Sequence, residues 1–296
     1  MTDTTYILEV TGDSEKIDAV SIAVPTKYHA QVAQVMLDRR IACLIEKPLA
    51  STVDEAQQLV DIAAACDTIV QVGHTERFNP AVRAVAAMDL TPRFMEVNRI
   101  SPMTFRSLDI GVVMDMMIHD LDIVLSLAQS EIAKVDATGV PVLGQHEDVV
   151  NARIVFESGC VANLTASRLA LKTERKMRFF SESAYVSLDY QSRNGMAIHK
   201  NDNEDALKDV RKQLDEGGDL SDLDYSDLVR MDQLSMDGAG ENDPLTAELE
   251  SFLDAVKHST TPVVDVQAGV AAIEAAQRVL QAIATHQWEG VSGTMM

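Results

Sequence analysis

Residues 114–124, MDMMIHDLDIV, combine an apolar helical pattern with side chains that can transfer protons. The absence of proline and glycine and the many apolar residues predict a helix. Asp115 and His119 are four residues apart, so on an α-helix they share one face, with Cβ atoms about 6 Å apart. A carboxylate in that position can orient an imidazole, fix its tautomer and raise its basicity. The spacing therefore makes His119 a candidate general base.

The same spacing has two other interpretations. The pair could be half of a metal site, although no third histidine, cysteine or carboxylate stands nearby at ligand spacing. It could also be a core histidine with a satisfied hydrogen bond beside an exposed aspartate, since buried polar groups usually find partners. The helix alone leaves these alternatives open.

A second candidate group, Lys47, lies in the segment ACLIEKP, residues 42–48, which has the pattern of a strand ended by Pro48. In open α/β sheets, ligands bind at the carboxyl ends of the parallel strands. A lysine there can act as an electrostatic or proton-relay group. The alternative is a lysine that merely caps a helix at the strand–loop boundary.

The elements that must position these groups alternate in type at the start of the chain. Short apolar segments rich in small and β-branched residues have the pattern of buried parallel strands. The segments between them have helical spacing, and one opens with Ser51 or Thr52 followed by acids, a capping-box pattern. This alternation predicts a doubly wound α/β domain over residues 1–80, with right-handed crossovers. The predicted strands are 18–25, 42–48 and 68–74, and the predicted helices are 29–41 and 51–66.

From about residue 92 the pattern changes to strands separated by turns, which predicts a second domain, residues 81–296, with a mostly antiparallel sheet. We expect the helix 111–129 to pack on one face of this sheet. Residues 201–243 are polar and acidic without a steady period, so a solvated excursion or a partly ordered loop is expected there. The predicted strands are 93–100, 134–143, 149–158, 160–169, 176–182, 184–190 and 195–200, and the closing helices are 243–258 and 266–287.

Composition limits the classes of partner. The chain has 296 residues and a formal net charge of −21, which repels nucleic acid and anionic membranes. An anionic metabolite would also be repelled, so binding one requires a local basic cluster. Basic residues on or beside the strands of the second predicted domain could supply it: Arg99, Arg106, Arg168, Lys172, Arg175 and Lys176.

Cys43, Cys66 and Cys160 lie far apart and form neither a disulfide framework nor a CxxC metal pattern. We expect buried free thiols, which fit a reducing cytoplasm. The first residues lack the basic and apolar regions of a signal peptide, and no apolar run approaches the length of a membrane span. These features predict a cytoplasmic protein.

Taken together, the segments AVPTKYH, IEKP, VGHTERFNP and DMMIHDLD resemble, in order and spacing, the Gfo/Idh/MocA family of nicotinamide-dependent sugar oxidoreductases. The resemblance implies that Lys47, Asp115 and His119 form the catalytic group. It implies NAD or NADP as the cofactor and no metal ligand. The residues implied to bind the cofactor or to lie at the domain junction beside it are Pro25, Thr26, His29, Glu46, Arg77 and Phe78.

Further segments, including HDLDIVLSL, VDATGVPVL and NARIVFESGCVANLTASR, resemble the UDP-N-acetylglucosamine 3-dehydrogenase type, which is associated with lipid A precursor synthesis. The resemblance implies a UDP-N-acetylhexosamine substrate and a homodimer or homotetramer. Arg99 and Arg168 are then candidate substrate ligands, and Arg168 is favoured because its bidentate fork suits phosphates and sugar hydroxyls. The alternative is that these are solvent-facing arginines at strand ends.

The chain departs from the family's pattern in one respect. A dinucleotide-binding domain normally begins with a strand, a GxGxxG turn and a helix whose N-terminus holds the pyrophosphate. No GxGxxG occurs in this sequence. We therefore expect a partial, N-terminally truncated Rossmann domain. Either the recorded start is internal to a longer protein or the chain is a shortened relative, and retention of Lys47, Asp115 and His119 favours the first.

Two functions follow from this departure. The first is an oxidoreductase that acts on a nucleotide sugar. The second is a non-catalytic relative that keeps the second domain as a sugar-binding or dimerising module. A metal-dependent hydrolase is a distant third. Titration with NAD(H) separates the first two, because only the oxidoreductase needs to bind it.

Overall fold

The computed structural model describes residues 17–103, 110–201, 203–217, 228–234 and 243–288. The chain divides into two compact units. The first unit consists of residues 1–74 and 248–273, and the second consists of residues 75–247 and 274–296. The domain boundary expected from the sequence, between residues 80 and 81, stays a prediction.

The first unit contains a parallel sheet with the strand order β1-β2-β3. Each strand is followed by a helix or a helical turn, as the alternation of apolar segments predicts. In the doubly wound order 3-2-1-4-5-6, one half of the sheet has this sequential arrangement. The α/β prediction is confirmed, with these bounds: β1 Ala19–Ile22, α2 His29–Leu37, β2 Ala42–Glu46, α3 Val53–Cys66 and β3 Val70–Gly73.

The predicted capping box sets the start of α3. Thr52 is the N-cap, and its hydroxyl oxygen accepts a hydrogen bond from the Glu55 backbone N–H at 3.2 Å. In return, the Glu55 carboxylate accepts from the Ser51 N–H at 3.0 Å. Two backbone donors at the helix start are thereby satisfied. The helix ends at Asp67, which adopts a left-handed conformation with φ of 50°.

The second unit is built on an eight-stranded sheet with the order β11-β10-β9-β8-β4-β7-β6-β5. All neighbouring strands run antiparallel except β4 and β7, which pair in parallel. The prediction of a mostly antiparallel sheet is confirmed. The strands are β4 Phe94–Ile100, β5 Ile132–Val140, β6 Val149–Phe156, β7 Val161–Ser167, β8 Glu174–Phe180, β9 Ala184–Asp189, β10 Asn194–Lys200 and β11 Val229–Gln233.

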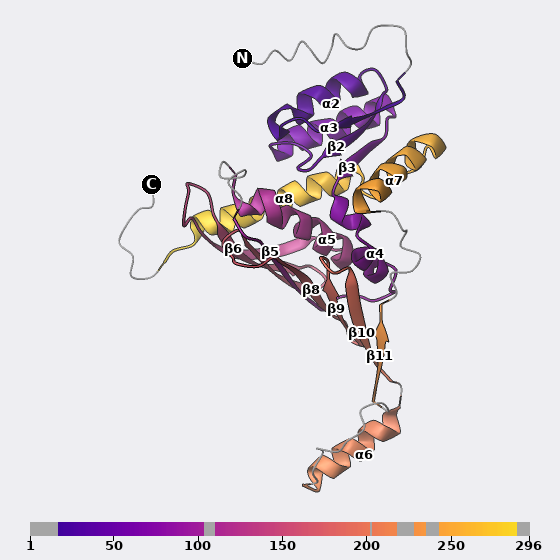
Figure 1. The fold of residues 1–296 in the computed structure, drawn as a ribbon, viewed down its shortest axis with the longest axis vertical. Helices are drawn as coiled ribbons and strands as arrows, with labels where there is room; N and C mark the ends of the chain where they lie inside the picture. Colours follow the sequence, from indigo (N-terminus) through magenta and orange to yellow (C-terminus); the bar gives the residue numbers. More distant parts are fainter. Residues whose placement is uncertain (1–16, 104–109, 202, 218–227, 235–242, 289–296) are drawn as a thin grey trace. The chain divides into compact units, whose positions relative to one another are not determined.

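Helices cover one face of this sheet (Figure 1). Along β4, Met95, Val97 and Arg99 are buried on the helix side, while the residues between them are half-buried on the other. This period of two is that of a strand with one covered face. The helical segments of the unit are η2 Thr75–Phe78, α4 Pro80–Ala86, η4 Val113–Met117, α5 Ile118–Ala128, α6 Glu204–Asp215, the start of α7 Pro244–His258 and the residues of α8 Val266–Thr285 from Glu274 on.

The loop predicted over residues 201–243 is wrong for much of the described part of that segment. The structure has helix α6 there, followed by strand β11, which pairs antiparallel with β10. Leu207, Val210 and Leu214 have helical spacing, but they are few among the acidic and other polar residues of this segment. Strand β11 forms because β10 offers it a ladder of backbone hydrogen bonds, a tertiary effect that local composition cannot reveal. Residues 202, 218–227 and 235–242 lie outside the described residues.

The three cysteines are free thiols, and two of them are fully buried. Burial raises the pKa of the Cys43 thiol to about 12 and that of Cys160 to about 11. Since the thiolate is the reactive form, neither is a nucleophile at neutral pH. The expectation of buried thiols is confirmed for these two, while Cys66 is half-buried.

None of the described helices combines the length and the apolar composition needed to cross a membrane.

A buried ion pair ties the end of β7 to the loop before β6. Asp148 is fully buried, and its carboxylate accepts from the Arg168 Nε at 2.5 Å. It also accepts from the backbone N–H groups of Val142 and Leu143, both at 2.7 Å. Burial favours the neutral acid, but these hydrogen bonds outweigh it and hold the pKa of Asp148 below its ordinary value. Asp148 therefore stabilises the fold in its charged form.

We expect Asp148→Asn to lower the free energy of unfolding by about 3 kcal/mol at pH 7, because a buried guanidinium loses its counter-charge. A depressed pKa means that this stabilisation is present above the unfolded-state pKa of about 3.9 and is lost as the pH falls through the folded-state value. The gap between wild type and variant should therefore narrow as the pH falls from 6 towards 3. Urea unfolding at several pH values measures it.

The matched control is Glu96→Gln, at a partly exposed ion pair with Arg178 on the same sheet. Exposed pairs contribute little to stability, so this variant should unfold like the wild type. Equal losses of stability in both variants would contradict the role given to Asp148.

Candidate active site

The helix that carries Asp115 and His119 is not a uniform α-helix. Residues Val113–Met117 form a π-helical turn, in which the Ile118 N–H bonds to the Val113 carbonyl, and α5 follows from Ile118. The sequence predicts a helix here but not the wider turn. Asp115 lies in the π turn and His119 in the first turn of α5. Such π turns occur often at functional sites.

Both side chains are half-buried on a helix that is otherwise largely in the core. The Nδ1 atom of His119 is shielded from solvent. Its neighbours Met117 and Ile118 are fully buried, and Met117 belongs to the core formed with the sheet. The structure thus presents the imidazole at the edge of a packed core, where a general base is both held and accessible.

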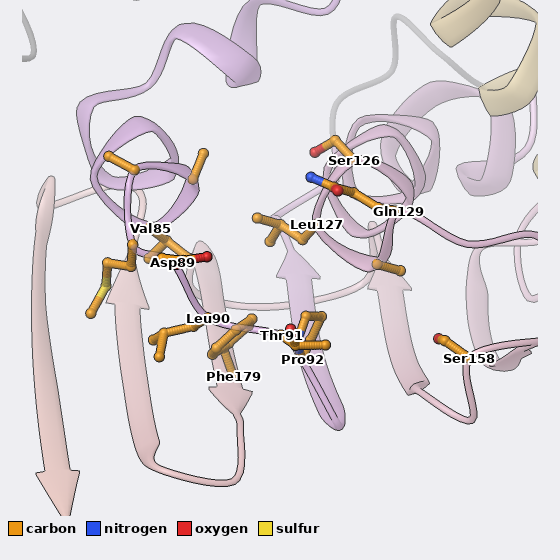
Figure 2. Close-up of a pocket in the computed structure, with 14 residues that line it drawn as sticks. Val85, Asp89, Leu90, Thr91, Pro92, Ser126, Leu127, Gln129, Ser158 and Phe179 are labelled. Atoms are coloured by element: carbon orange, nitrogen blue, oxygen red, sulfur yellow. The ribbon is translucent and has the colours of Figure 1, made fainter.

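The opposite end of α5 borders a pocket of about 570 Å³ (Figure 2). Its walls are the end of α4 with the residues after it, 85–92, and the last turn of α5, 126–129, together with Ser158 and Phe179. Ser126 is seven residues from His119, which is about 10 Å along a helix. No residue predicted to act in catalysis, cofactor binding or substrate binding lines this pocket. It is therefore separate from the predicted site.

The start of the His119 helix is held by Glu147, from the loop before β6. The Glu147 carboxylate accepts from the Val113 N–H at 3.2 Å, and its carbonyl accepts from the Val112 N–H at 3.1 Å. The position of this carboxylate requires a glycine at 111. A Cβ added at Gly111 would lie 2.0 Å from a Glu147 carboxylate oxygen. The carboxylate both caps the first turn and complements the positive end of the helix dipole.

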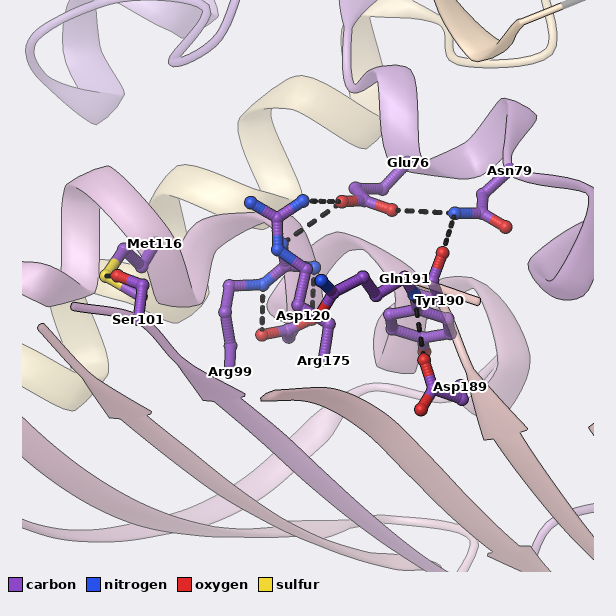
Figure 3. A network of polar contacts seen from close by, with 10 residues as sticks. All are labelled: Glu76, Asn79, Arg99, Ser101, Met116, Asp120, Arg175, Asp189, Tyr190 and Gln191. Atoms are coloured by element: carbon purple, nitrogen blue, oxygen red, sulfur yellow. Dashed lines mark hydrogen bonds and ion pairs between the residues drawn. The ribbon is translucent and has the colours of Figure 1, made fainter. Parts of the chain in front are cut away.

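A buried ion pair fixes the same helix against strand β4 (Figure 3). The Nε and Nη2 atoms of Arg99 donate to the two oxygens of Asp120, both at 2.8 Å. The Nη1 atom of Arg99 donates to Glu76 Oε1 at 3.1 Å. Asp120 follows His119 directly in the chain. A two-toothed contact of this kind fixes orientation as well as distance, so it sets the position of the first turn of α5.

Within this cluster, attraction between opposite charges opposes the effect of burial. Burial lowers the pKa of Arg99, but the carboxylates of Asp120 and Glu76 outweigh this and raise it. Burial likewise raises the pKa of Asp120, and the Arg99 guanidinium opposes that shift. Since arginine stays protonated in proteins, the bidentate geometry is that of a guanidinium with an ionised carboxylate.

Arg77 and Phe78, the predicted pair at the domain junction, lie in η2. The Nε atom of Arg77 is 3.5 Å from Asp122 Oδ2 on α5, and Phe78 is buried. The residue after them, Asn79, is the N-cap of α4, and its side chain accepts from the Ala81 N–H at 3.0 Å. The contact between Arg77 and Asp122 joins η2 to α5, the helix that carries His119.

The first unit gathers its predicted site residues at the carboxyl ends of β1 and β2. Glu46 and Lys47 are half-buried where β2 ends, and the Lys47–Pro48 peptide bond is cis. Pro25 and Thr26 follow β1 and are at least partly exposed. This is the edge at which open α/β sheets bind their ligands.

His29 has a different environment from the other predicted cofactor ligands. It is buried, with Nδ1 2.8 Å from the Pro48 carbonyl oxygen and Nε2 2.8 Å from the Val24 carbonyl oxygen. The ring therefore joins the loops after β1 and β2. This contact supports a role in holding the strand-end residues in place, and direct contact of His29 with a cofactor stays a prediction.

That these strand-end residues hold the nicotinamide half of a dinucleotide is a prediction that their chemistry allows. Gly73, at the end of β3, leaves room for Glu46, whose carboxylate would lie 3.3 Å from a Cβ at that position. An acid at this edge can accept hydrogen bonds from ribose hydroxyls, and the Lys47 ammonium adds a positive charge. No glycine-rich strand-to-helix turn that would hold the pyrophosphate is found within the described residues.

The two predicted substrate ligands are both buried and engaged by protein carboxylates. Arg99 contacts Asp120 and Glu76, and Arg168 contacts Asp148 and donates to the Ile110 carbonyl at 2.7 Å. These contacts support structural roles, and their assignment to the substrate stays a prediction. Arg106 lies outside the described residues. No group of three or more metal-ligating side chains is found in the part of the chain that the structure describes.

Sequence reasoning missed Glu76, Asp120 and Glu147 as residues that position the candidate base. One signal was available for Asp120. The alternation Met95, Val97, Arg99 places Arg99 on the core face of its strand, and a buried guanidinium requires a buried carboxylate. Helix 111–129 offered several acids for this purpose. No local pattern pointed to Glu147, because its partner Gly111 is 36 positions away in the chain.

Two family models match the chain. One describes an oxidoreductase family with an NAD-binding Rossmann fold and matches residues 2–74. The other describes the GFO/IDH/MocA C-terminal domain and matches residues 82–187.

Curated relatives extend this likeness. The chain is 34% identical over 269 residues to a UDP-N-acetylglucosamine 3-dehydrogenase of Acidithiobacillus ferrooxidans, covering 90% of this chain and 79% of that protein. It is 30% identical over 167 residues to a scyllo-inositol 2-dehydrogenase (NAD(+)) of Bacillus subtilis, covering 51% of this chain and 49% of the relative.

Solved structures agree with these matches. A crystal form of the Acidithiobacillus ferrooxidans enzyme superposes with a TM-score of 0.80 at 32% identity, covering 96% of this chain and 82% of that one. An inositol dehydrogenase homolog from Azotobacter vinelandii, complexed with NADH and myo-inositol, has a TM-score of 0.72 at 17% identity, covering 95% and 79%. At this identity the second likeness shows the fold alone.

The contact between Gly111 and Glu147 predicts a non-additive pair of substitutions. Glu147→Ala and Gly111→Ala should each lower the free energy of unfolding by about 1 kcal/mol, because each removes the carboxylate from the helix start. In the Glu147→Ala background, Gly111→Ala should cost almost nothing, since no carboxylate remains to be displaced. Urea unfolding of the two single variants and the double variant measures this coupling. Additive losses would contradict the capping role of Glu147.

Proposed function

We propose a reaction for this chain, which belongs to the Gfo/Idh/MocA family of oxidoreductases. The two matched models and the 34% identical relative show this membership. The proposed reaction is hydride transfer between NAD or NADP and a hydroxyl group of a UDP-N-acetylhexosamine. The observation that carries the substrate is the match to a UDP-N-acetylglucosamine 3-dehydrogenase over 90% of this chain.

The catalytic roles follow from the chemistry of the three candidate side chains. His119 takes the proton of the sugar hydroxyl when the sugar is oxidised and returns it when the product is reduced. Asp115, one turn earlier, holds the imidazole in the tautomer that can accept this proton. Lys47 stabilises the negative charge that develops on the oxygen. The nicotinamide, when bound, accepts or supplies the hydride.

Support for His119 as the base comes from the second unit itself. The imidazole lies at the start of α5. Before it in the chain, the Val113 N–H donates to Glu147, and directly after it, Asp120 accepts from Arg99 of β4. A proton-transfer group must be held within hydrogen-bond reach of its substrate, and small displacements cost large factors in rate. The contacts on either side of His119 hold the imidazole in place in this way.

In the first unit, Glu46 is proposed to contact the nicotinamide ribose, and Pro25 and Thr26 are proposed to lie against the cofactor. His29 joins the two loops that carry them. The proposed fit covers the nicotinamide half of the cofactor.

His119→Ala should lower kcat for UDP-N-acetylglucosamine by about 100-fold or more, because general-base catalysis commonly contributes 100- to 10,000-fold. The measurement is the rate of change of nicotinamide absorbance with NAD or NADP. His146→Ala, at an exposed loop histidine, is the matched control and should retain wild-type turnover. Thermal unfolding should show that both variants are folded. Wild-type turnover by His119→Ala would remove this residue from the mechanism.

A second candidate function is favoured by the absence of the GxGxxG turn from this sequence. On that alternative the chain is a sugar-binding or dimerising module without redox activity. Titration with NADH, followed by nicotinamide fluorescence, separates the two. Binding that weakens in Glu46→Ala supports the oxidoreductase. A folded protein that binds UDP-N-acetylglucosamine but no NADH or NADPH supports the module.

A further inference from the structure

Two arginines occupy directly opposite positions on neighbouring strands. Arg99 of β4 pairs in register with Arg175 of β8. On an antiparallel pair such residues have Cβ atoms about 5 Å apart, and two like charges there destabilise the sheet. Retaining the pair requires either neutralising carboxylates or a ligand that uses both charges.

The first arginine of the pair is neutralised internally. Arg99 gives two donors to Asp120 and a third to Glu76, and its side chain is only 5% exposed. The two carboxylates balance the Arg99 charge within the protein, and direct contact of Arg99 with a ligand stays a prediction.

The second arginine is engaged more weakly and is accessible. Arg175 contacts the same Glu76 oxygen as Arg99 through Nη1, at 3.4 Å, and its side chain is 46% exposed. The other oxygen of Glu76 accepts from the Asn79 side chain at 3.3 Å. Glu76 thus divides one charge between two guanidinium groups, and Figure 3 shows both of them directed at it.

The direction of Arg175 also distinguishes it from its neighbours. Along β8, Met177 and Phe179 are buried in the helix-covered core, and Arg175 has the same parity. Lys176 has the opposite parity and so lies on the other face of the sheet. Arg175 is therefore placed on the same side of the sheet as the helix that carries His119.

We propose that the Arg175 guanidinium binds a phosphate group of the substrate, with Arg99 and Glu76 as the buried support that orients it. This inference rests on the proposed function, because a nucleotide sugar is the ligand that brings a pyrophosphate to this site. A chain with a net charge of −21 must recognise such an anion through local cations. Arg175 combines accessibility, a fork-shaped donor set and a connection through Glu76, Arg99 and Asp120 to the His119 turn.

The test uses the full chain and three variants. Arg175→Ala removes the proposed ligand, and Arg175→Lys keeps its charge without the fork. Arg178→Ala is the matched control, because this arginine lies on the same strand with the opposite parity and is exposed to a similar extent, 49% against 46%. Two quantities are measured for each protein: KM for UDP-N-acetylglucosamine and the Kd of inorganic pyrophosphate by calorimetry. Thermal unfolding verifies the fold.

We expect Arg175→Ala to raise both KM and Kd by about 10- to 100-fold, as for the loss of a charged hydrogen bond. Arg175→Lys should lie between it and the wild type, and Arg178→Ala should match the wild type. Equal constants in Arg175→Ala and wild type, equal losses in Arg175→Ala and Arg178→Ala, or no pyrophosphate binding by the wild type would each overturn the inference.

Failure of the proposed function gives a different result. A wild-type chain that binds pyrophosphate through Arg175 but does not turn over UDP-N-acetylglucosamine would keep the anion site and reject the substrate. Turnover with the same KM in wild type and Arg175→Ala would keep the substrate and reject the anion site.

Discussion

The second unit depends on a buried guanidinium. Arg99 stands on the core face of β4 beside Met95 and Val97, where a charge without a partner would cost several kcal/mol. Asp120 supplies the partner from α5 in a bidentate contact. A bidentate contact forms only within a small range of distances and angles, so it fixes the position of α5 over the sheet. His119 lies in the same turn as Asp120, so the ion pair of Asp120 also fixes the position of the candidate base.

Most of the fold could be predicted from periodicity, because side-chain pattern reflects which face of an element is covered. The strands β1 to β10 and the capping of α3 by Thr52 belong to this class. Two features could not be predicted. The π turn at Val113–Met117 begins where backbone N–H groups bond to the distant Glu147, and β11 pairs with the edge of β10. Both are tertiary effects with no local signature.

The candidate site shows the same limit at the level of single residues. Asp115, His119 and Lys47 could be named from spacing and motif, because the residues that identify each of them lie close to it in the sequence. Arg99 and Arg168 were recognised as cations suited to an anionic ligand, yet each contacts an internal carboxylate. Alternation assigns a side chain to a face of the sheet. Whether a helix, a carboxylate or a ligand covers that face depends on residues 20 or more positions away.

Net charge and local charge have different consequences in this protein. At physiological ionic strength, charges more than about 8 Å apart are largely screened, so the overall −21 weakly affects a ligand already at the site. What the ligand encounters is the cluster of Arg99, Arg175, Glu76 and Asp120, which holds two positive and two negative groups. Both negative groups have Arg99 as a partner, and only Arg175 has a half-exposed side chain. The accessible part of a neutral cluster is therefore positive, which allows an acidic protein to present a binding surface for an anion.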